Sequence, residues 1–287
     1  MLRERLEVGA EPMAGYRLRQ KRGEGGFAEV WEATSPEGTL VALKFVNARL
    51  RDAFREVRSI QSIGKLRHPH LIDVHQTWSL PGYVVVSMEL GEGSLLDLLE
   101  ACEHEFGTPL PVEDLLRYME QAASAIDFLN ARKHKMDSWQ VGFQHCDIKP
   151  SNLMLVDGKV KVADFGLATM MTTQTARTSK SGTIAFAPPE IHQGHLTHRS
   201  DQFSLAVSYY MLRTGRLPYL DLPDQFDAKF IHPAPDLTGL LPNEKPVVAQ
   251  ALSTAMGDRW GSCGEFVRAL QTRMIDPNKP SNGSRFF

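Results

Sequence analysis

The chain has 287 residues, with 32 Lys and Arg against 34 Asp and Glu, a formal net charge of −2 and 42% hydrophobic residues. At about 150 residues per domain, this length corresponds to one large domain or two lobes. Proteins that coat nucleic acids or membrane surfaces are normally more basic, so the balanced charge argues against both classes. No nucleic-acid partner is therefore expected.

No membrane or secretory segment is expected either. The longest stretch without Asp, Glu, Lys or Arg is residues 74–88, 15 residues interrupted by Pro81-Gly82, whereas a bilayer requires about 20 apolar residues. Residues 1–11 carry charges where a secretory signal needs an apolar core, and the three cysteines are too few for a disulfide or zinc framework. These features predict a cytoplasmic location.

Both ends of the chain differ in composition from the middle. Residues 1–15 are polar without periodicity and are predicted to be a flexible N-terminus, and residues 276–287 are rich in turn formers and are interpreted as a linker-like tail. The ordered domain is expected over residues 16–275.

The first third of this domain has the pattern of a small sheet crossed by one helix. Residues 41–46 and 83–86 are apolar or β-branched runs that predict strands, while Leu50, Phe54, Val57 and Ile60 between them fall at helical spacing. We therefore expect a β-rich lobe at the start of the chain.

The remainder has the pattern of helices. Residues 112–129 keep a 3.6-residue period, and residues 203–212 are apolar on nearly every face, which predicts a helix in the middle of a core. Between them, residues 153–156 and 159–162 are strand-like runs joined by Asp157-Gly158, a strong hairpin indicator.

A glycine-rich segment over residues 23–30, GEGGFAEV, lies just before the strand-rich region of the first third. Glycines at this spacing let backbone N–H groups approach phosphate oxygens, although a flexible hairpin is the alternative. Further on, Lys44 interrupts an apolar strand and Glu56 lies on the next expected helix. A lysine directed at a phosphate needs such a counter-charge, but an edge-strand lysine and a solvated glutamate explain the same pattern.

Three further motifs follow in order: His145-Cys146-Asp147-Ile148-Lys149-Pro150-Ser151-Asn152, Asp164-Phe165-Gly166 and Ala187-Pro188-Pro189-Glu190. With the glycine-rich segment, Lys44 and Glu56, they resemble the protein-kinase signature over about 260 residues. Lys149 and Gly182-Thr183 resemble the serine/threonine branch, and the general pattern is similar to eukaryotic-like (Hanks-type) kinases of bacteria. The resemblance implies an α+β, bilobal fold with a β-rich lobe over about 16–90 and a mainly helical lobe over about 91–275.

The resemblance also implies ATP and Mg²⁺ as cofactors, with Mn²⁺ as the alternative ion, and a role for each matching residue. Asp147 would accept or orient the proton of the attacking hydroxyl, Lys149 would offset charge on the transferring phosphate, and Lys44, paired with Glu56, would hold the inner phosphates. Metal ligands would be Asn152 and Asp164. The expected nucleotide-binding residues are Gly23, Gly25, Gly26, Ala28, Val30, Ala42, Lys44, Glu89, Gly91 and Met154.

The same resemblance assigns one further position at the nucleotide site and two structural roles. Met88 would stand at the gatekeeper position, Asp201 would cap the central helix, and Arg259 would pair with Glu190.

The chain departs from the family pattern at four places. Ala28 replaces the third glycine of the loop, Arg22 replaces an apolar residue before it, and residues 133–141 look inserted as a surface excursion. Cys146 replaces the arginine that, in other kinases, pairs with a phosphorylated activation loop. This last departure predicts that loop phosphorylation is not the activating event, and Cys146 itself is interpreted as a small buried hydrophobic residue, with a redox-sensitive thiol as the alternative.

The predicted function is transfer of the ATP γ-phosphate to Ser or Thr hydroxyls of protein substrates, including the chain itself, with dimerisation left open. Two alternatives remain. A pseudokinase scaffold would need no catalysis, yet Lys44, Glu56, Asp147, Asn152 and Asp164 are all retained. A small-molecule phosphotransferase would not need the peptide-docking segment that ends at Glu190.

Overall fold

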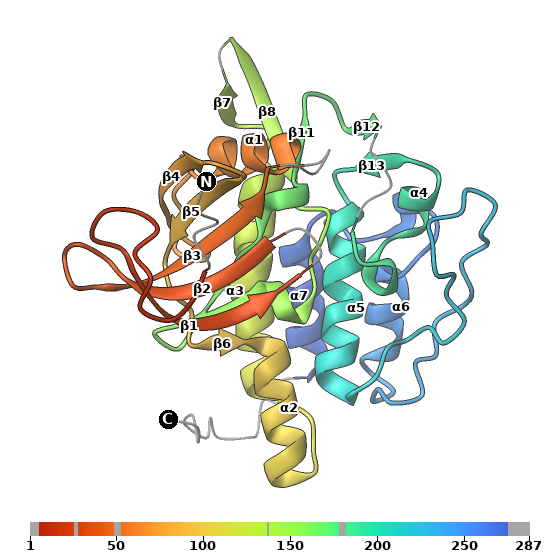
Figure 1. The fold of residues 1–287 in the computed structure, drawn as a ribbon. Helices are drawn as coiled ribbons and strands as arrows, with labels where there is room; N and C mark the ends of the chain where they lie inside the picture. Colours follow the sequence, from red (N-terminus) through yellow and green to blue (C-terminus); the bar gives the residue numbers. More distant parts are fainter. Residues whose placement is uncertain (1–5, 26–27, 49–52, 137, 178–181, 275–287) are drawn as a thin grey trace. The chain divides into compact units, whose positions relative to one another are not determined.

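The computed structural model describes residues 6–25, 28–48, 53–136, 138–177 and 182–274, without the side chains of 53–56 and 177. The described residues form two compact units (Figure 1). The smaller unit comprises the residues up to Arg67 together with Leu71–Glu92, and the larger one comprises His68–His70 and the residues from Gly93 onward.

The smaller unit is a five-stranded antiparallel sheet with one helix. The strand order is β1-β2-β3-β5-β4. Its elements are β1 (Arg17–Glu24), β2 (Ala28–Thr34), β3 (Leu40–Asn47), α1 (Ala53–Ile63), β4 (Val74–Leu80) and β5 (Tyr83–Met88). The predicted strands over 41–46 and 83–86 are confirmed as β3 and β5, and the predicted helix as α1, while Leu50 lies outside the described residues.

One face of this sheet carries an apolar core of alternating strand residues. Leu18, Trp31, Leu43, Phe45 and Val85 are each at most 5% exposed and form a single cluster. Strand side chains alternate between faces with a period of two, so their neighbours in sequence line the opposite face.

The described part of the N-terminal segment packs on this sheet. Gly9 N–H donates to Leu18 O at 2.8 Å, Leu18 N–H donates to Ala10 O at 2.8 Å, and Met13 is buried within the cluster. Residues 6–15 are therefore attached to the sheet, in contrast with the flexible N-terminus predicted over residues 1–15. Such a polar segment needs few buried apolar side chains, because backbone hydrogen bonds to the sheet also hold it in place.

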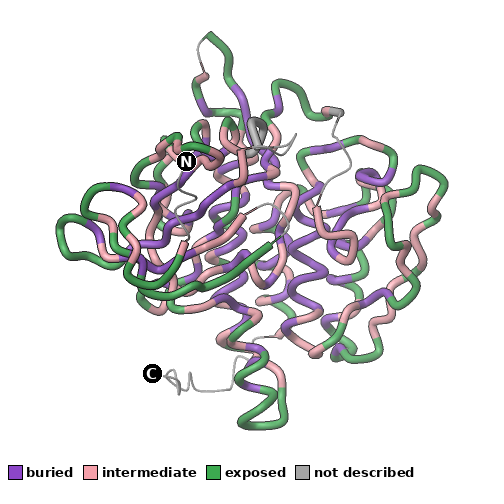
Figure 2. The backbone as a smooth tube through the Cα atoms, viewed as in Figure 1, coloured by how far each residue is buried: buried purple, intermediate pink, exposed green. Residues whose placement is uncertain are grey.

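The described part of the larger unit is built from helices and three small antiparallel sheets. Figure 2 shows α5 buried along nearly its whole length, and 12 of its 15 residues are buried, which confirms the core helix predicted from residues 203–212. The predicted helix over 112–129 is confirmed as α3. The elements are β6 (Gly93–Ser94), α2 (Leu95–Phe106), α3 (Val112–Asn130), β7 (His134–Met136), β8 (Trp139–Gln144), η1 (Pro150–Asn152), β9 (Leu153–Val156), β10 (Lys159–Val162), η2 (Phe165–Leu167), β11 (Thr169–Met171), β12 (Thr175–Arg177), η3 (Ile184–Phe186), α4 (Pro189–His192), β13 (His195–Thr197), α5 (Ser200–Thr214), α6 (Lys245–Ala251), η4 (Met256–Asp258) and α7 (Cys263–Met274).

Two hairpins adjoin the predicted catalytic motifs in the sequence. Strands β9 and β10 pair across Asp157 and Gly158, both with positive φ (48° and 66°), which confirms the hairpin predicted from that dipeptide. Strands β7 and β8 form the second hairpin, over the residues that looked inserted (Figure 1). Trp139 is 68% exposed on this hairpin, but His134 is buried and its Nε2 lies 2.7 Å from Phe128 O, so the excursion is fixed at its base.

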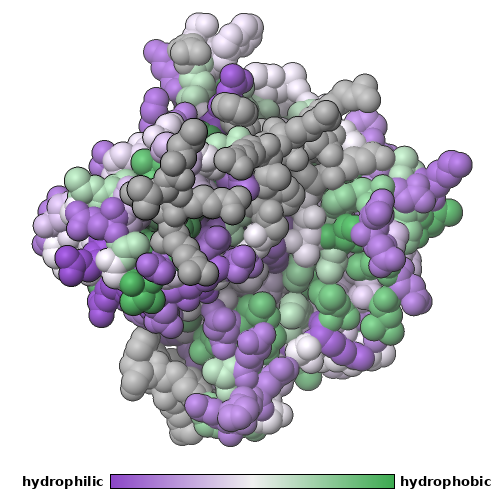
Figure 3. Space-filling view, viewed as in Figure 1, coloured by the Kyte–Doolittle hydropathy of each residue, from purple (hydrophilic) through white to green (hydrophobic). Residues whose placement is uncertain are grey.

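The segment between α5 and α6 contains no helix or strand and is held by aromatic side chains. The His232 ring lies edge-on to Tyr219 and Phe203, with ring centroids 4.2 Å and 5.4 Å apart, and 5.6 Å from the Phe230 ring. Hydrophobic side chains also gather on the surface over this segment, at the right of Figure 3. Because His232 packs among aromatic rings, protonation of its imidazole is expected to lower the stability of the fold.

Stability is expected to fall as the pH drops from neutral towards 4. Burial lowers the pKa of His232 to about 4 against an ordinary value of 6.5, with smaller effects from the charges of His192, Arg259 and Glu190. A base with a lowered folded-state pKa stabilises the fold fully above 6.5 and loses that contribution as the pH falls through 6.5 towards 4. Since the ring is only partly buried, the loss should be about 1–2 kcal/mol.

The free energy of urea unfolding at pH 7 and pH 4.5 tests this expectation. The His232→Phe variant should lose about 1 kcal/mol less than the wild type between the two pH values, whereas a His195→Gln control at an exposed position should behave as the wild type. Equal losses in all three proteins would refute the assignment.

Among the helices that the structure describes, none has both the length and the apolar character needed to cross a membrane.

Candidate active site

The glycine-rich segment is the turn between β1 and β2. Gly25 N–H donates to Ala28 O at 2.9 Å, which closes the hairpin, while Gly26 lies outside the described residues. Among the described residues, a Cβ added at Gly23 would meet no atom within 4 Å, and one at Gly25 would meet only Ala28 O, at 3.9 Å. The packing of the chain therefore does not require these glycines, and the space beside them is open.

The register of β2, β3 and β5 places several predicted nucleotide residues on one face of the sheet. Val30 lies opposite Lys44, and Lys44 opposite Val86, while Ala42 lies opposite Met88. Lys44 is only 8% exposed. Glu56 lies in α1, but its side chain is outside the described part of the structure, so its predicted pairing with Lys44 stays a prediction.

Arg22, the residue that departs from the apolar family pattern, is held by an acidic side chain on this face. Its Nε donates to Glu32 Oε2 at 3.0 Å, and Glu32 lies opposite Ala42 in the register. Glu32 is buried to 7% exposure. Glu32 thus supplies the counter-charge of Arg22 on the sheet face that also carries Lys44.

The residues directly after β5 include Glu89 and Gly91, two of the predicted nucleotide-binding residues. Glu89 N–H donates to Asp73 O at 2.9 Å, and Asp73 N–H donates to Glu89 Oε2 at 3.2 Å, so β4 and β5 stay joined beyond Met88. Gly91 makes no hydrogen bond with another residue in the described ranges. On the larger unit, Met154 lies in β9, opposite Lys161 and Ser94.

The predicted catalytic motif, residues 145–152, begins directly after β8 and is hereafter called the catalytic loop. A carboxylate of α5 holds its first residues. Asp201 is buried, and its two carboxylate oxygens accept from the N–H groups of His145 at 2.7 Å and Cys146 at 2.9 Å. Burial raises the pKa of Asp201, an effect that these hydrogen bonds oppose. The expectation that Asp201 caps α5 is wrong, because no side chain caps that helix and the carboxylate supports the catalytic loop instead.

Asp147 is the centre of the polar network in this loop. Its Oδ2 lies 2.9 Å from Lys149 Nζ and accepts from Asn152 Nδ2 at 3.1 Å. Its Oδ1 accepts from Thr183 twice, from N–H at 3.0 Å and from Oγ1 at 2.8 Å. Lys149 Nζ also donates to Thr183 Oγ1 at 2.8 Å. The structure thus brings three of the predicted residues together and adds Thr183.

The two predicted metal ligands present oxygen atoms from different elements. Asn152 Nδ2 donates to Asp147 O at 2.8 Å, which orients the amide so that its Oδ1 is left without a donor among the described residues. Asp164 has φ 63° and caps η2, where its Oδ1 accepts from Gly166 N–H at 3.4 Å. Amide and carboxylate oxygens are the ligand types that Mg²⁺ prefers.

Gly182 allows the substrate-side segment to approach the catalytic loop. It has φ +119°, a conformation that side-chain-bearing residues rarely adopt, and a Cβ placed there would lie 2.7 Å from Cys146 O. Thr183, the next residue, reaches Asp147 because of this close approach.

Replacing Gly182 with alanine should therefore separate Thr183 from Asp147. We expect kcat to fall by about tenfold or more, from backbone strain of about 1–3 kcal/mol and the clash with Cys146 O. The matched control is Gly107→Ala, which also has positive φ (67°) but no atom within 4 Å of the added Cβ. Steady-state kinetics and thermal unfolding of both variants check this; a similar loss of kcat in both would contradict the role of Gly182.

Cys146 packs among apolar side chains where other kinases are expected to hold a charge pair. It has φ 68° and lies against a cluster of Met171, Ala187, Ile191 and Leu196. Its Sγ lies 3.4 Å from Gln144 O. The interpretation of Cys146 as a hydrophobic packing residue is thus supported, but the residue is only partly buried and not buried as predicted. All three cysteines are free thiols.

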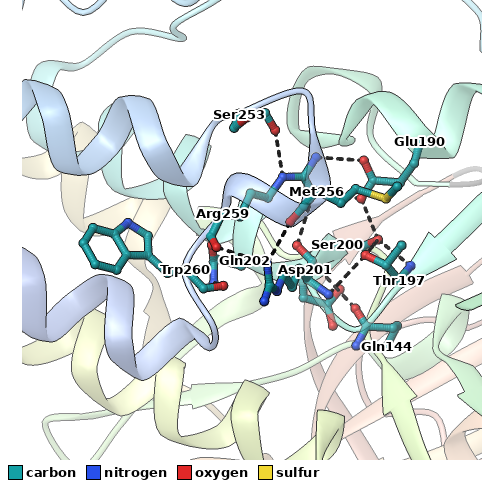
Figure 4. A network of polar contacts seen from close by, with 11 residues as sticks. Gln144, Glu190, Thr197, Ser200, Asp201, Gln202, Ser253, Met256, Arg259 and Trp260 are labelled. Carbon is teal, nitrogen blue, oxygen red and sulfur yellow. Dashed lines mark hydrogen bonds and ion pairs between the residues drawn. The ribbon is translucent and has the colours of Figure 1, made fainter. Parts of the chain in front are cut away.

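A second network anchors the segment after the catalytic loop (Figure 4). Arg259 makes two parallel contacts with Glu190, Nη1 to Oε1 and Nη2 to Oε2, both at 2.8 Å, which confirms the predicted pair. Both residues are at most 4% exposed. Ser200 Oγ donates to Glu190 Oε1 at 2.8 Å, so the start of α5 joins the same network.

Residues 16–253 match the family model described as the protein kinase domain. The chain belongs to the protein kinase family. This confirms the family resemblance and the α+β class, with a β-rich unit and a helical unit.

Curated relatives of this kinase include bacterial and fungal proteins. It is 27% identical to the serine/threonine-protein kinase PknF of Mycobacterium tuberculosis, over 94% of this chain and 58% of that protein. It is 29% identical to the serine/threonine-protein kinase PknH of Mycobacterium bovis, over 92% of this chain and 45% of PknH. The SNF1-like protein kinase ssp2 of Schizosaccharomyces pombe is 31% identical over 74% of this chain and 36% of ssp2. The kinase chain thus spans less than two thirds of these relatives' lengths.

Sequence reasoning missed two participants in the kinase site. Thr183 was noted only as part of a substrate-side marker, and its contact with Asp147 spans 36 positions. Gln144 was not singled out, yet its Oε1 accepts from Asp201 N–H at 3.3 Å, beside the carboxylate that holds the catalytic loop.

Proposed function

We propose that the chain is an active serine/threonine protein kinase that transfers the γ-phosphate of ATP to Ser and Thr hydroxyls of proteins, including its own. The observation that carries this proposal is the network in which Asp147 accepts from Asn152 and Thr183 and pairs with Lys149. A scaffold protein without catalysis would have no need for a carboxylate so fully oriented.

In this proposal Asp147 receives the proton of the attacking hydroxyl, or orients it towards the phosphate. Lys149 lies within 2.9 Å of the same carboxylate and offsets negative charge as it builds up on the transferred group. Thr183 fixes the second oxygen of Asp147, so only one carboxylate orientation is available. Pre-positioning of this kind lowers the barrier because no reorganisation is needed during the reaction.

The residues present fit ATP and a divalent cation. The open space beside Gly23 and Gly25 leaves room for phosphate oxygens near the backbone. Asn152 Oδ1 and the Asp164 carboxylate would hold Mg²⁺, or Mn²⁺ in its place, and the bound ion would neutralise phosphate charge. No group of three or more His, Cys, Asp or Glu side chains suited to a metal occurs within the described ranges, which accords with an ion that takes its other ligands from the nucleotide.

Phosphate transfer from labelled ATP tests the proposal. The chain is incubated with ATP and Mg²⁺, alone and with a generic basic protein, and the modified residues are mapped by mass spectrometry. Label on Ser or Thr supports the proposal. Nucleotide binding without any transfer would overturn it in favour of a signalling scaffold.

We further infer that activity does not depend on phosphorylation of the loop after Asp164. The loop is supported by apolar packing of Cys146 with Met171, and by pairing of β12 with β13, neither of which needs a phosphate. Thr169 stands where a second basic partner would be expected.

Alanine replacement of the loop hydroxyls should leave kcat within about threefold of the wild type, because packing rather than charge orders the loop. The replaced residues are Thr172, Thr173, Thr175, Thr178, Ser179 and Ser181, of which the last three lie outside the described residues. Circular dichroism checks that the variant folds. Loss of activity in a folded variant would refute the inference.

A further inference from the structure

A small polar cavity lies behind the catalytic loop of the larger unit. It has a volume of about 200 Å³. Its lining residues come from the end of α3 and the turn after it, the end of β8, the end of β11 and the loop after it, and the residue after β13. They are Asn130, Arg132, Gln144, Met171, Thr173, Gln174 and His198. No residue assigned to the nucleotide or metal lines this cavity.

The cavity carries positive charge without a counter-charge. Arg132 makes no hydrogen bond or ion pair with any residue in the described ranges. None of the lining residues is acidic. Every other lining side chain except Met171 offers a hydrogen-bonding group, so an oxyanion would find both a cation and donors there.

The pKa of His198 is affected by the positive charges near the cavity. Its backbone N–H donates to Gln174 O at 3.2 Å, which keeps the residue at the cavity edge. Partial burial lowers the pKa of its imidazole, and the charges of Arg199 and Arg132 lower it further, against the opposing effect of a hydrogen bond with the Gln174 backbone. Arg199 Nη1 is already engaged with the carbonyl oxygens of Met256 and Gly257, whereas Arg132 is not engaged.

We propose that this cavity is a phosphate-binding site, in which Arg132 and His198 hold a phosphate dianion or phosphate monoester. Arg132 supplies the fixed charge, and His198 takes up a proton as the anion enters. Two sources share this chemistry: inorganic phosphate from solution, and a phosphate carried by Thr173, whose side chain lines the cavity and whose Oγ1 donates to Thr175 O.

The cavity adjoins the support of the catalytic loop. Gln144 contacts Asn130 through its side-chain amide and accepts from Asp201 N–H through Oε1. Asp201 in turn holds His145 and Cys146. A phosphate bound in the cavity therefore stabilises the folded form of this region, and it should raise the unfolding temperature of the chain.

The imidazole pKa of His198, measured by NMR, tests the site in three preparations. The first is the Asp147→Asn chain titrated with inorganic phosphate at constant ionic strength. The second carries phosphoserine at position 173, incorporated during translation, so it needs no kinase activity of the chain. The third repeats both with Arg132→Gln. His195, exposed on β13, serves as the internal control for general salt effects.

We expect the His198 pKa to rise by about one unit, a tenfold change in its protonation equilibrium, when phosphate is bound. A rise in the first preparation identifies free phosphate as the source, and a rise only in the second identifies the loop phosphate. In either case Arg132→Gln should abolish the rise, and His195 should stay unchanged. No rise in either preparation, or a rise that persists in Arg132→Gln, would overturn the proposal whether or not the chain proves to be an active kinase.

Discussion

Replacing Asp147 with asparagine is expected to lower kcat by about 100-fold to 10,000-fold, the range associated with loss of a positioned proton acceptor. An asparagine amide would also place a second donor against Lys149 Nζ and Asn152 Nδ2, which now meet a carboxylate oxygen at 2.9 Å and 3.1 Å. Nucleotide affinity should change by less than about threefold, because Asp147 is not one of the proposed phosphate or metal contacts.

The matched control for this variant is Asp157→Asn. Asp157 lies in the β9–β10 turn with φ 48°, and asparagine tolerates this conformation as well as aspartate does. The control should retain wild-type kcat. Steady-state kinetics, nucleotide titration calorimetry and thermal unfolding of both variants give the required measurements; retention of kcat in Asp147→Asn would remove the basis for the proposed function.

Breaking the buried pair between Arg259 and Glu190 is expected to have the largest effect on stability. The two residues are 3% and 4% exposed, and they share two hydrogen bonds of 2.8 Å. Arg259→Met would leave the glutamate charge buried, with Ser200 Oγ as its one remaining donor among the residues that the structure describes. The free energy of unfolding should fall by about 3–5 kcal/mol, because an unpaired buried charge is costly.

A double variant separates the penalty of an unpaired charge from the net value of the pair. Arg259→Met combined with Glu190→Leu removes both charges, and it should be more stable than Arg259→Met alone. The exposed Arg268→Met on α7 is the control for loss of a surface arginine and should change stability by less than about 0.5 kcal/mol. Urea unfolding at pH 7 measures all three. If the double variant were less stable than the single one, the glutamate charge would not be the cause of the loss.

The local elements could be predicted because their causes are local. Asp157-Gly158 predicts a hairpin, since both residues accept positive φ, and the structure has 48° and 66° there. The uniformly apolar run over 203–212 predicts a helix with no solvent-facing side, as α5 has. The resemblance to kinases identified which residue types to expect in the site.

The partners of the site residues could not be predicted from spacing. Asp201 lies 56 positions from His145, and Thr183 lies 36 positions from Asp147, so only the folded chain brings each pair together. The role expected for Asp201 was wrong for this reason, since a helix cap is a local contact and the N–H groups that donate to its carboxylate belong to distant residues. The packing of residues 6–15 was missed because a short polar segment shows no periodicity even when Met13 is buried.

The attachment of the catalytic loop to α5 determines how this loop opens. A single buried carboxylate accepts the consecutive amide protons of His145 and Cys146, and it belongs to the most buried helix that the structure describes in the larger unit. We expect those two amides to exchange with deuterated solvent only when α5 unfolds. Their exchange rates should therefore follow global unfolding rather than local fluctuation. The segment that performs chemistry therefore belongs to the same cooperative folding unit as the core, and a mutation that destabilises the core will also release this loop.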